Sequence, residues 1–158
     1  MPPSLLFDIS DVDLDQVIYD QEAIRRVIPQ RGAMEHLNGI IWIKGEDMVG
    51  FKDVGENEFW VEGHIPGRPL LPGVIMLEAA AQMASFYAHT VLGWTGFIGF
   101  AGVENVKFRT SVPPGKRMHL LCRKLSDRHR QIRAAAQGIV DGNLVFEATI
   151  IGSRLGPS

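Results

Sequence analysis

Hydrophobic residues follow two different patterns along this chain, and the difference predicts its helices and strands. From Val74 to about Ala88 the sequence VIMLEAAAQMASFYA is apolar nearly all round, which predicts a long helix that is buried on most of its surface. A short helix, QEAIRRVI, is predicted after Asp20, whose side chain can cap its first turn, and Pro29 ends it. We expect Gly93 to end the long helix.

The other segments are rich in β-branched and aromatic residues and predict strands. Asp141-Gly142 lies between two of them and is a strong signal for a type I′ hairpin turn. The most economical packing is an antiparallel sheet with the long helix buried against it, so the predicted fold class is α+β. The predicted strands are residues 38–45, 48–54, 95–109, 117–125, 130–140 and 143–152.

Composition and charge narrow the class of protein. The 158 residues are 46% hydrophobic, so we expect residues 1–158 to form a single domain, with the acid-rich residues 1–19 as a loose N-terminal segment. A net charge near −2 without a basic stripe argues against a nucleic-acid partner. Cys122 is the only cysteine, which fits a cytoplasmic protein. No basic leader and no apolar run of ~18–20 residues is present, so we expect neither a signal peptide nor a membrane span.

A polar stripe interrupts the long helix. Glu78, Gln82, Ser85 and His89 follow at spacings of 4, 3 and 4, which places them on one helix face. The simplest interpretation is that the stripe faces water or pairs with a neighbouring element. Glu78 is, however, the only charged residue of this stretch, and a buried carboxyl has a raised pKa that suits general acid catalysis. Gln82, one turn further along, can hydrogen-bond to Glu78 and orient it.

The loop before the helix, residues 63–73 (GHIPGRPLLPG), contains three prolines and three glycines that fix its course. A lone histidine in a loop, such as His64, is more often a surface residue than a catalyst. A loop that fixes the direction of the side chain, however, also suits a general base. The Pro72-Gly73 step opens the helix, so the N–H groups of Gly73 and Val74 are available to a developing oxyanion. A base, an acid and an oxyanion site close together suit chemistry beside a carbonyl group.

The remaining candidate groups indicate no other chemistry. The other histidines show no metal-ligand spacing with one another or with Cys122, so no metal is expected. Phosphate-binding loops, serine-nucleophile elbows and HExxH motifs are absent from the sequence. A basic cluster is either a solvated strand face or a contact for an acidic partner; it consists of Arg117, Arg123, Lys124, Arg128, Arg130 and Arg133.

Residues 63–82, GHIPGRPLLPGVIMLEAAAQ, closely resemble the signature of the 3-hydroxyacyl-acyl carrier protein dehydratases (FabZ/FabA type, hotdog fold). The resemblance extends from about Ile24 to Ile151: FIGFAGVENVKFRTSVPPG is similar to the family's later strand and Pro-Gly turn, and VDGNLVFEATI to its final hairpin. It implies a long helix wrapped by an antiparallel sheet. It also implies a homodimer, with a trimer of dimers as the larger assembly, and active sites at the dimer interface.

The same resemblance implies the roles of the site residues. His64 of one chain is the catalytic base and Glu78 of the other is the catalytic acid. The Gly73 amide, with Val74 beside it, binds the substrate, and Gln82 supports Glu78. The implied reaction removes water from a (3R)-3-hydroxyacyl thioester on acyl carrier protein and gives a trans-2-enoyl thioester, in fatty-acid or related lipid or polyketide biosynthesis. It uses no metal and no organic cofactor. Glutamate rather than aspartate at position 78 resembles the branch that does not isomerise the double bond.

One segment departs from the family pattern. Where typical members read roughly Pro-His-Arg-Tyr-Pro-Phe-Leu-Leu-Val-Asp, residues 29–38 read PQRGAMEHLN, so Glu35 and His36 replace two apolar residues of the first strand. We hypothesise that Glu35 and His36 line or flank the acyl tunnel and make it more polar.

Two other functions are compatible with the same fold. A hotdog acyl thioesterase hydrolyses its substrate, which needs a carboxylate that activates water. A non-catalytic acyl-thioester binding subunit would not need His64 or Glu78, and both are present. Fold alone does not decide between these functions.

Overall fold

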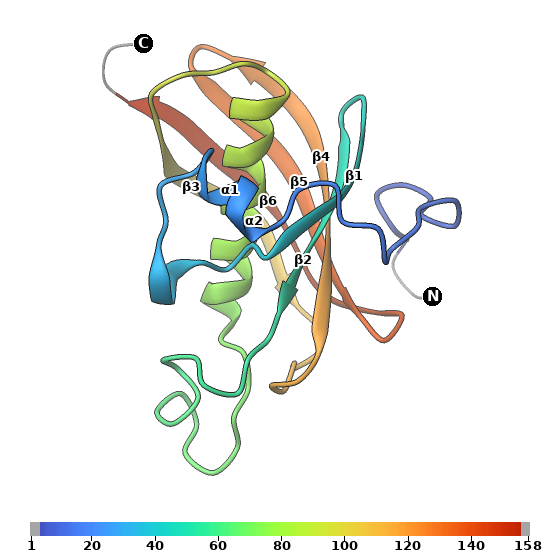
Figure 1. The fold of residues 1–158 in the computed structure, drawn as a ribbon, viewed down its shortest axis with the longest axis vertical. Helices are drawn as coiled ribbons and strands as arrows, with labels where there is room; N and C mark the ends of the chain where they lie inside the picture. Colours follow the sequence, from blue (N-terminus) through green and yellow to red (C-terminus); the bar gives the residue numbers. More distant parts are fainter. Residues whose placement is uncertain (1–3, 156–158) are drawn as a thin grey trace.

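One long helix packs against one six-stranded sheet in the computed structural model, which describes residues 4–155 (Figure 1). Every pair of neighbouring strands is antiparallel, in the order β1-β2-β4-β5-β6-β3. The α+β prediction is therefore confirmed. In chain order the elements are α1 (Gln21–Arg25), η1 (Gly32–Met34), β1 (Gly39–Lys44), β2 (Asp47–Asp53), α2 (Gly73–Thr90), β3 (Phe97–Phe108), β4 (Arg117–Arg128), β5 (Gln131–Val140) and β6 (Asn143–Leu155).

Helix α2 is buried on most sides, as its apolar sequence predicts. Its alanines Ala79, Ala80, Ala84 and Ala88 are almost completely buried, and their small side chains let the helix approach the sheet closely. Its neighbours in the sheet are β6, β5 and β4. The helix ends at Thr90, with Gly93 beyond it at a positive φ of 72°. No helix within residues 4–155 is long and apolar enough to cross a membrane.

The two edges of the sheet differ. Residues 18 and 19 cover part of the β1 edge, because Tyr19 accepts a hydrogen bond from Ile40 N and donates one to Ile40 O. Strand β3 forms the opposite edge over twelve residues and pairs only with β6. Its exposed large hydrophobic side chains are Phe97, Phe100, Val103 and Phe108.

Turn chemistry explains the register of the last hairpin. Asp141 and Gly142 have φ values of 51° and 78°, so both central residues adopt the left-handed conformation that a type I′ turn requires. Val140 pairs with Asn143 directly across the turn. The predicted hairpin is confirmed.

The N-terminal segment covers the face of the sheet opposite α2 with its residues 4–14 (Figure 1). Leu6 N donates to Gln137 Oε1 at 2.8 Å, and Gln137 Nε2 donates to Ser4 O at 3.0 Å. Phe7 stacks at an angle on Trp42, with ring centroids 5.7 Å apart. These residues are therefore packed rather than loose, because successive strand residues point to opposite faces and leave a second apolar surface to cover. That surface consists of Ile41, Val49, Phe51, Leu121 and Ile139.

We expect Phe7→Ala to lower the free energy of unfolding by about 1–3 kcal/mol, because a half-buried aromatic ring loses its contacts with the outer face. Urea unfolding would measure the change. Val17→Ala, at a residue that is 42% exposed, is the matched control and should have little effect. An unchanged midpoint for Phe7→Ala would show that the segment does not pack on the sheet in solution.

Candidate active site

His64 is held by a loop that is tied down at both ends. His64 N donates to Trp60 O at 2.9 Å, and Leu71 N donates to Val112 O at 2.8 Å. The His64 side chain is exposed, and its Nδ1 lies 2.8 Å from the carbonyl oxygen of Leu70. Because a carbonyl oxygen only accepts, Nδ1 carries the hydrogen in this contact and Nε2 keeps the lone pair. The loop therefore presents His64 Nε2 as a proton acceptor.

The first turn of α2 opens into the same cavity as His64. Pro72 precedes the helix and offers no side-chain cap, so the N–H groups of Gly73 and Val74 have no acceptor within residues 4–155. These residues line a cavity of about 440 Å³ with His64 and Phe108. A Cβ on Gly73 would lie 2.8 Å from the Phe108 ring, so only glycine allows the helix to begin this close to β3.

Glu78 lies on a different face of the helix, in a small cavity between α2 and β3. The cavity walls are mostly apolar, including Ala81, Ile98 and Phe100, and Gln30 also reaches it. Burial raises the pKa of Glu78, and a hydrogen bond from Gln82 partly opposes this shift. No charged side chain among residues 4–155 contributes to the shift. The carboxyl is thus biased toward its protonated form.

Gln82 is 1% exposed and uses every hydrogen-bonding group of its amide. Its Nε2 donates to Glu78 Oε2 at 2.9 Å and to Met34 O at 2.7 Å. Its Oε1 accepts from His36 N at 3.0 Å. A flipped amide would place Oε1 against the carbonyl oxygen of Met34, so the orientation of Gln82 is fixed by the backbone of residues 34–36.

The predicted site residues therefore fall into two groups within one chain. His64, Gly73 and Val74 share one cavity, and Glu78 and Gln82 share another. The five residues from Gly73 to Glu78 rotate the side-chain direction by roughly 140°, which accounts for the separation. The spacing of four residues predicts the contact of Gln82 with Glu78, but it does not predict the backbone partners of Gln82 in residues 34–36. The only sequence signal for these partners is the polar character of Glu35 and His36.

A FabA-like domain matches residues 28–149 of the chain. The chain belongs to the FabA-like family. It is 31% identical over 137 residues to a 3-hydroxyacyl-[acyl-carrier-protein] dehydratase FabZ of Saccharophagus degradans, covering 84% of this chain and 94% of that protein. It is 33% identical to the protein of the same name from Syntrophobacter fumaroxidans, covering 85% of this chain and 92% of the relative.

Among solved structures, the dehydratase heterocomplex ApeI:P of Xenorhabdus doucetiae superposes with a TM-score of 0.71 at 12% identity, covering 84% of this chain and 91% of that one. At this level of identity the match is evidence for the fold alone. It confirms the hotdog fold, with a long helix against an antiparallel sheet.

The segment that departs from the family pattern forms part of a polar cluster beside β2. Lys52 is 1% exposed, and its Nζ lies 2.8 Å from Glu58 Oε1 and 3.1 Å from His36 Nδ1. Gly55 N and Trp60 Nε1 also donate to Glu58. Burial raises the pKa of Glu58, but these hydrogen bonds and the charge of Lys52 outweigh it and lower the pKa overall. We call His36, Lys52 and Glu58 the polar cluster.

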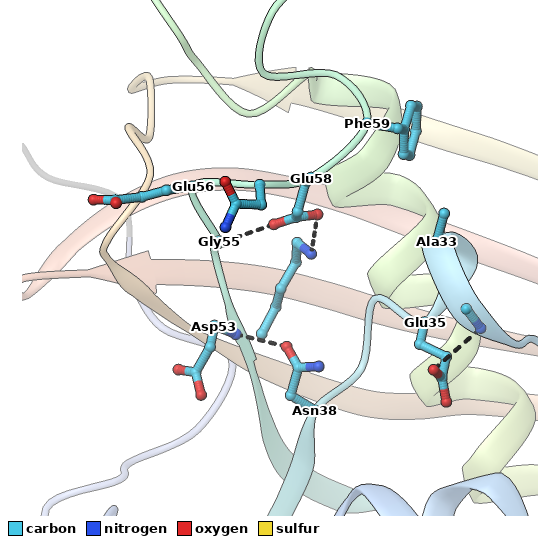
Figure 2. A pocket seen from close by; sticks show the side chains of 11 residues that line it. Ala33, Glu35, Asn38, Asp53, Gly55, Glu56, Glu58 and Phe59 are labelled. Atoms are coloured by element: carbon cyan, nitrogen blue, oxygen red, sulfur yellow. Dashed lines mark hydrogen bonds and ion pairs between the residues drawn. The ribbon is translucent and has the colours of Figure 1, made fainter.

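A cavity of about 380 Å³ adjoins the polar cluster. Figure 2 shows Glu58 and Glu35 on opposite sides of this cavity. Between them, Asn38 Oδ1 accepts a hydrogen bond from Asp53 N at 2.7 Å. Glu35 forms an ion pair with Arg25 and accepts from Gly32 N. Neither Glu35 nor His36 lines the cavity that contains Glu78, so the structure does not support their direct contact with an acyl chain there.

The basic cluster is largely neutralised within the chain. Four of its six members form ion pairs with carboxylates, two of them between the neighbouring strands β4 and β2. An acidic partner would have to compete with these intramolecular contacts. The pairs are Arg117–Asp53, Arg123–Asp47, Lys124–Asp127 and Arg133–Glu104.

We expect His36 to make the fold sensitive to acid. Burial and the nearby Lys52 charge lower the pKa of His36 from 6.5 to about 4. Between these values the unfolded chain binds a proton that the folded chain does not, so stability present above pH 6.5 is lost as the pH falls toward 4. The slope from this residue should approach about 1.4 kcal/mol per pH unit.

His36→Asn should flatten this dependence in urea unfolding measured from pH 7 to pH 4, because asparagine does not titrate. His129→Asn, at an exposed position with a positive φ of 55°, is the matched control and should keep the slope of the unmodified protein. Equal slopes for His36→Asn and the unmodified protein would contradict the prediction.

Proposed function

We propose that this chain is a dehydratase that converts a (3R)-3-hydroxyacyl thioester on acyl carrier protein to a trans-2-enoyl thioester and water. The observation that carries the proposal is the presence of a candidate base and a candidate acid in a chain whose relatives have this activity in their names. His64 Nε2 is an available proton acceptor, and Glu78 is a carboxyl whose pKa is raised by burial. We place the reaction in fatty-acid or related lipid or polyketide biosynthesis and in the cytoplasm.

In the proposed mechanism His64 Nε2 removes a proton from the carbon beside the thioester carbonyl. Negative charge develops on the carbonyl oxygen, and the N–H groups of Gly73 and Val74 stabilise it, aided by the positive end of the helix dipole. The electrons of the broken C–H bond form the C=C bond as the bond to the 3-hydroxyl group breaks. Glu78 protonates the departing hydroxyl group, and water leaves. Proton transfer from His64 back to Glu78 restores the site.

The fixed amide of Gln82 supports a specific role for each oxygen of Glu78. Oε2 accepts the Nε2–H of Gln82 at 2.9 Å. The proton of the neutral acid is therefore best held on Oε1, which Gln82 does not contact. We assign Oε1 as the atom that donates the proton to the leaving hydroxyl group.

A raised pKa also separates this proposal from the thioesterase alternative. A carboxylate that activates water must be ionised, whereas burial favours the protonated form of Glu78. Incubation of the purified protein with 3-hydroxyacyl thioesters of several lengths, on acyl carrier protein and on coenzyme A, tests the proposal directly. Enoyl formation is expected. Release of the free carrier thiol without enoyl product would indicate a thioesterase instead.

We further propose that residues 1–158 form a single domain that works as a homodimer with sites shared between the chains. Two observations support this assembly. His64 and Glu78 lie in separate cavities of one chain, and the long β3 edge carries exposed Phe100 and Val103. An uncovered apolar strand edge is a liability that pairing with a second copy removes. A trimer of dimers rests on the family resemblance alone.

We expect Val103→Arg to produce a folded monomer without dehydratase activity, because a charge on the β3 edge opposes its pairing with a second chain. Sedimentation velocity and circular dichroism would measure assembly and folding. Leu125→Arg is the matched control, since Leu125 is 51% exposed on β4 and away from that edge. An active monomer would exclude the shared site.

We expect Glu78→Gln to lower dehydration by about 10²-fold or more while the fold is kept or stabilised. A carboxyl whose pKa is raised on folding contributes stability at low pH that is lost as the pH rises, so its removal should help most near neutrality. Thermal unfolding and the dehydration rate would be compared at pH 7. Near-normal turnover would show that Glu78 is structural.

His64→Ala should be folded and inactive as well, and mixing the two variants should restore part of the activity. In a mixed dimer one site contains both His64 and Glu78, while the other site lacks both. Subunit exchange is verified by mass spectrometry. Absence of rescue after proven exchange would leave the chemistry intact but exclude a site shared between chains.

A further inference from the structure

We propose that His36 is a positioning residue for Glu78, acting through a clamp that the backbone of residues 34–36 forms on Gln82. The inference rests on the proposed role of Glu78 as the catalytic acid. His36 itself does not contact the reacting atoms in this proposal. Its side chain holds the clamp in place from the other side of the segment.

The clamp consists of two hydrogen bonds of opposite polarity. His36 N donates to Gln82 Oε1 at 3.0 Å, and Met34 O accepts from Gln82 Nε2 at 2.7 Å. Together they permit only one orientation of the amide, which leaves the second Nε2 hydrogen for Glu78 Oε2. A shift of the 34–36 segment would weaken both bonds and free the amide to rotate. The position of Glu78 thus depends on a segment that is distant in sequence.

The side chain of His36 anchors this segment to β2. Its Nδ1 accepts a hydrogen bond from Lys52 Nζ at 3.1 Å, and Lys52 is held in turn by Glu58 at 2.8 Å. Glu35, on the other side of the chain, forms an ion pair with Arg25 and accepts from Gly32 N. The segment is therefore fastened on both sides, and the apolar residues that the family pattern has at positions 35 and 36 could form neither contact.

Stability alone does not account for the imidazole. Because Nδ1 accepts from Lys52, the hydrogen of the neutral ring is on Nε2, and this buried atom has no hydrogen-bond partner among residues 4–155. An unsatisfied buried donor is costly compared with an apolar side chain of similar shape. A residue retained at this cost fits a role in positioning the clamp.

A double-mutant cycle tests the proposal through turnover. His36→Leu removes the anchor, and Gln82→Met removes the amide on which it acts. Each should lower kcat about tenfold, the rate equivalent of one lost hydrogen bond, with KM changed less than about twofold. The double variant should be no slower than the slower single variant, because both changes break one chain of contacts. Additive losses would overturn the proposal.

Matched variants separate positioning from general damage to the core. His36→Asn keeps an acceptor near the position of Nδ1 and should retain kcat within about threefold. His119→Leu removes a half-buried histidine on β4 whose buried Nε2 also has no hydrogen-bond partner among residues 4–155, and it should leave kcat unchanged. If His36→Asn were as slow as His36→Leu, the contact with Lys52 would not be the anchor. Should His36→Leu fail to fold, Lys52→Met removes the same contact and replaces it in the cycle.

A second readout does not depend on dehydration. Carbon-13 NMR titration of the Glu78 carboxyl should give a higher pKa in His36→Leu and in Gln82→Met alike, since both weaken a bond that favours the anion. His119→Leu should leave that pKa unchanged. If the pKa responds in this way but no enoyl product forms, the proposed function fails while the clamp stands. If dehydration occurs but the pKa of Glu78 is unchanged in His36→Leu, the proposal for His36 is wrong while the proposed function stands.

Discussion

The structure depends on the burial of α2, because a helix enclosed on nearly all sides must find a partner for each of its polar groups. Burying its aliphatic and aromatic side chains contributes about 1.5–3 kcal/mol each, whereas each unsatisfied buried polar group costs about 1–3 kcal/mol. The surrounding chain meets this requirement from several directions. Tyr87 Oη donates to Gly45 O, His89 Nδ1 contacts Trp94 O, and Gln82 is enclosed by the 34–36 backbone. The helix therefore determines where distant loops must lie.

Because of the same burial, polar groups of α2 reach a cavity at two places. One is its first turn, where Pro72 provides no cap and the N–H groups meet the His64 cavity. The other is the short stripe at Glu78, which faces β3 rather than His64. The proposed base and the proposed acid thus open onto different faces of one helix, in separate cavities of one chain. The homodimer that we propose, joined along the β3 edge, would bring the two cavities together, and this edge is not covered by the N-terminal segment.

Features set by local pattern could be predicted from the sequence. The apolar run from Val74 gave α2, Asp141-Gly142 gave the hairpin turn, and the four-residue spacing gave the contact of Gln82 with Glu78. Features set by long-range contacts could not be predicted. Residues 4–19 look loose because their acids are conspicuous, but their alternate apolar residues cover the outer face of the sheet.

The polar cluster and the basic cluster illustrate the same limit. Lys52 and His36 are sixteen residues apart, and Arg123 lies seventy-six residues from Asp47. No spacing rule links such pairs, because only the order of the strands brings them together. Glu35 and His36 mark residues 29–38 as unusual in the sequence, but the sequence does not show which way their side chains point. It faces Arg25 and Lys52 instead of the cavity at Glu78.

In the role proposed for it, Glu78 gives up its proton and recovers it in each cycle, and two opposing contacts act on its pKa. Burial between α2 and β3 favours the neutral carboxyl, and the Gln82 N–H favours the anion that remains after proton donation. The second effect requires that the amide presents its nitrogen and not its oxygen. If the Gln82 amide rotated freely, it could also present its oxygen, because a protonated Glu78 can donate to Gln82 Oε1 just as well. The backbone of residues 34–36 removes the choice, and the buried contact of His36 with Lys52 holds that backbone against the helix.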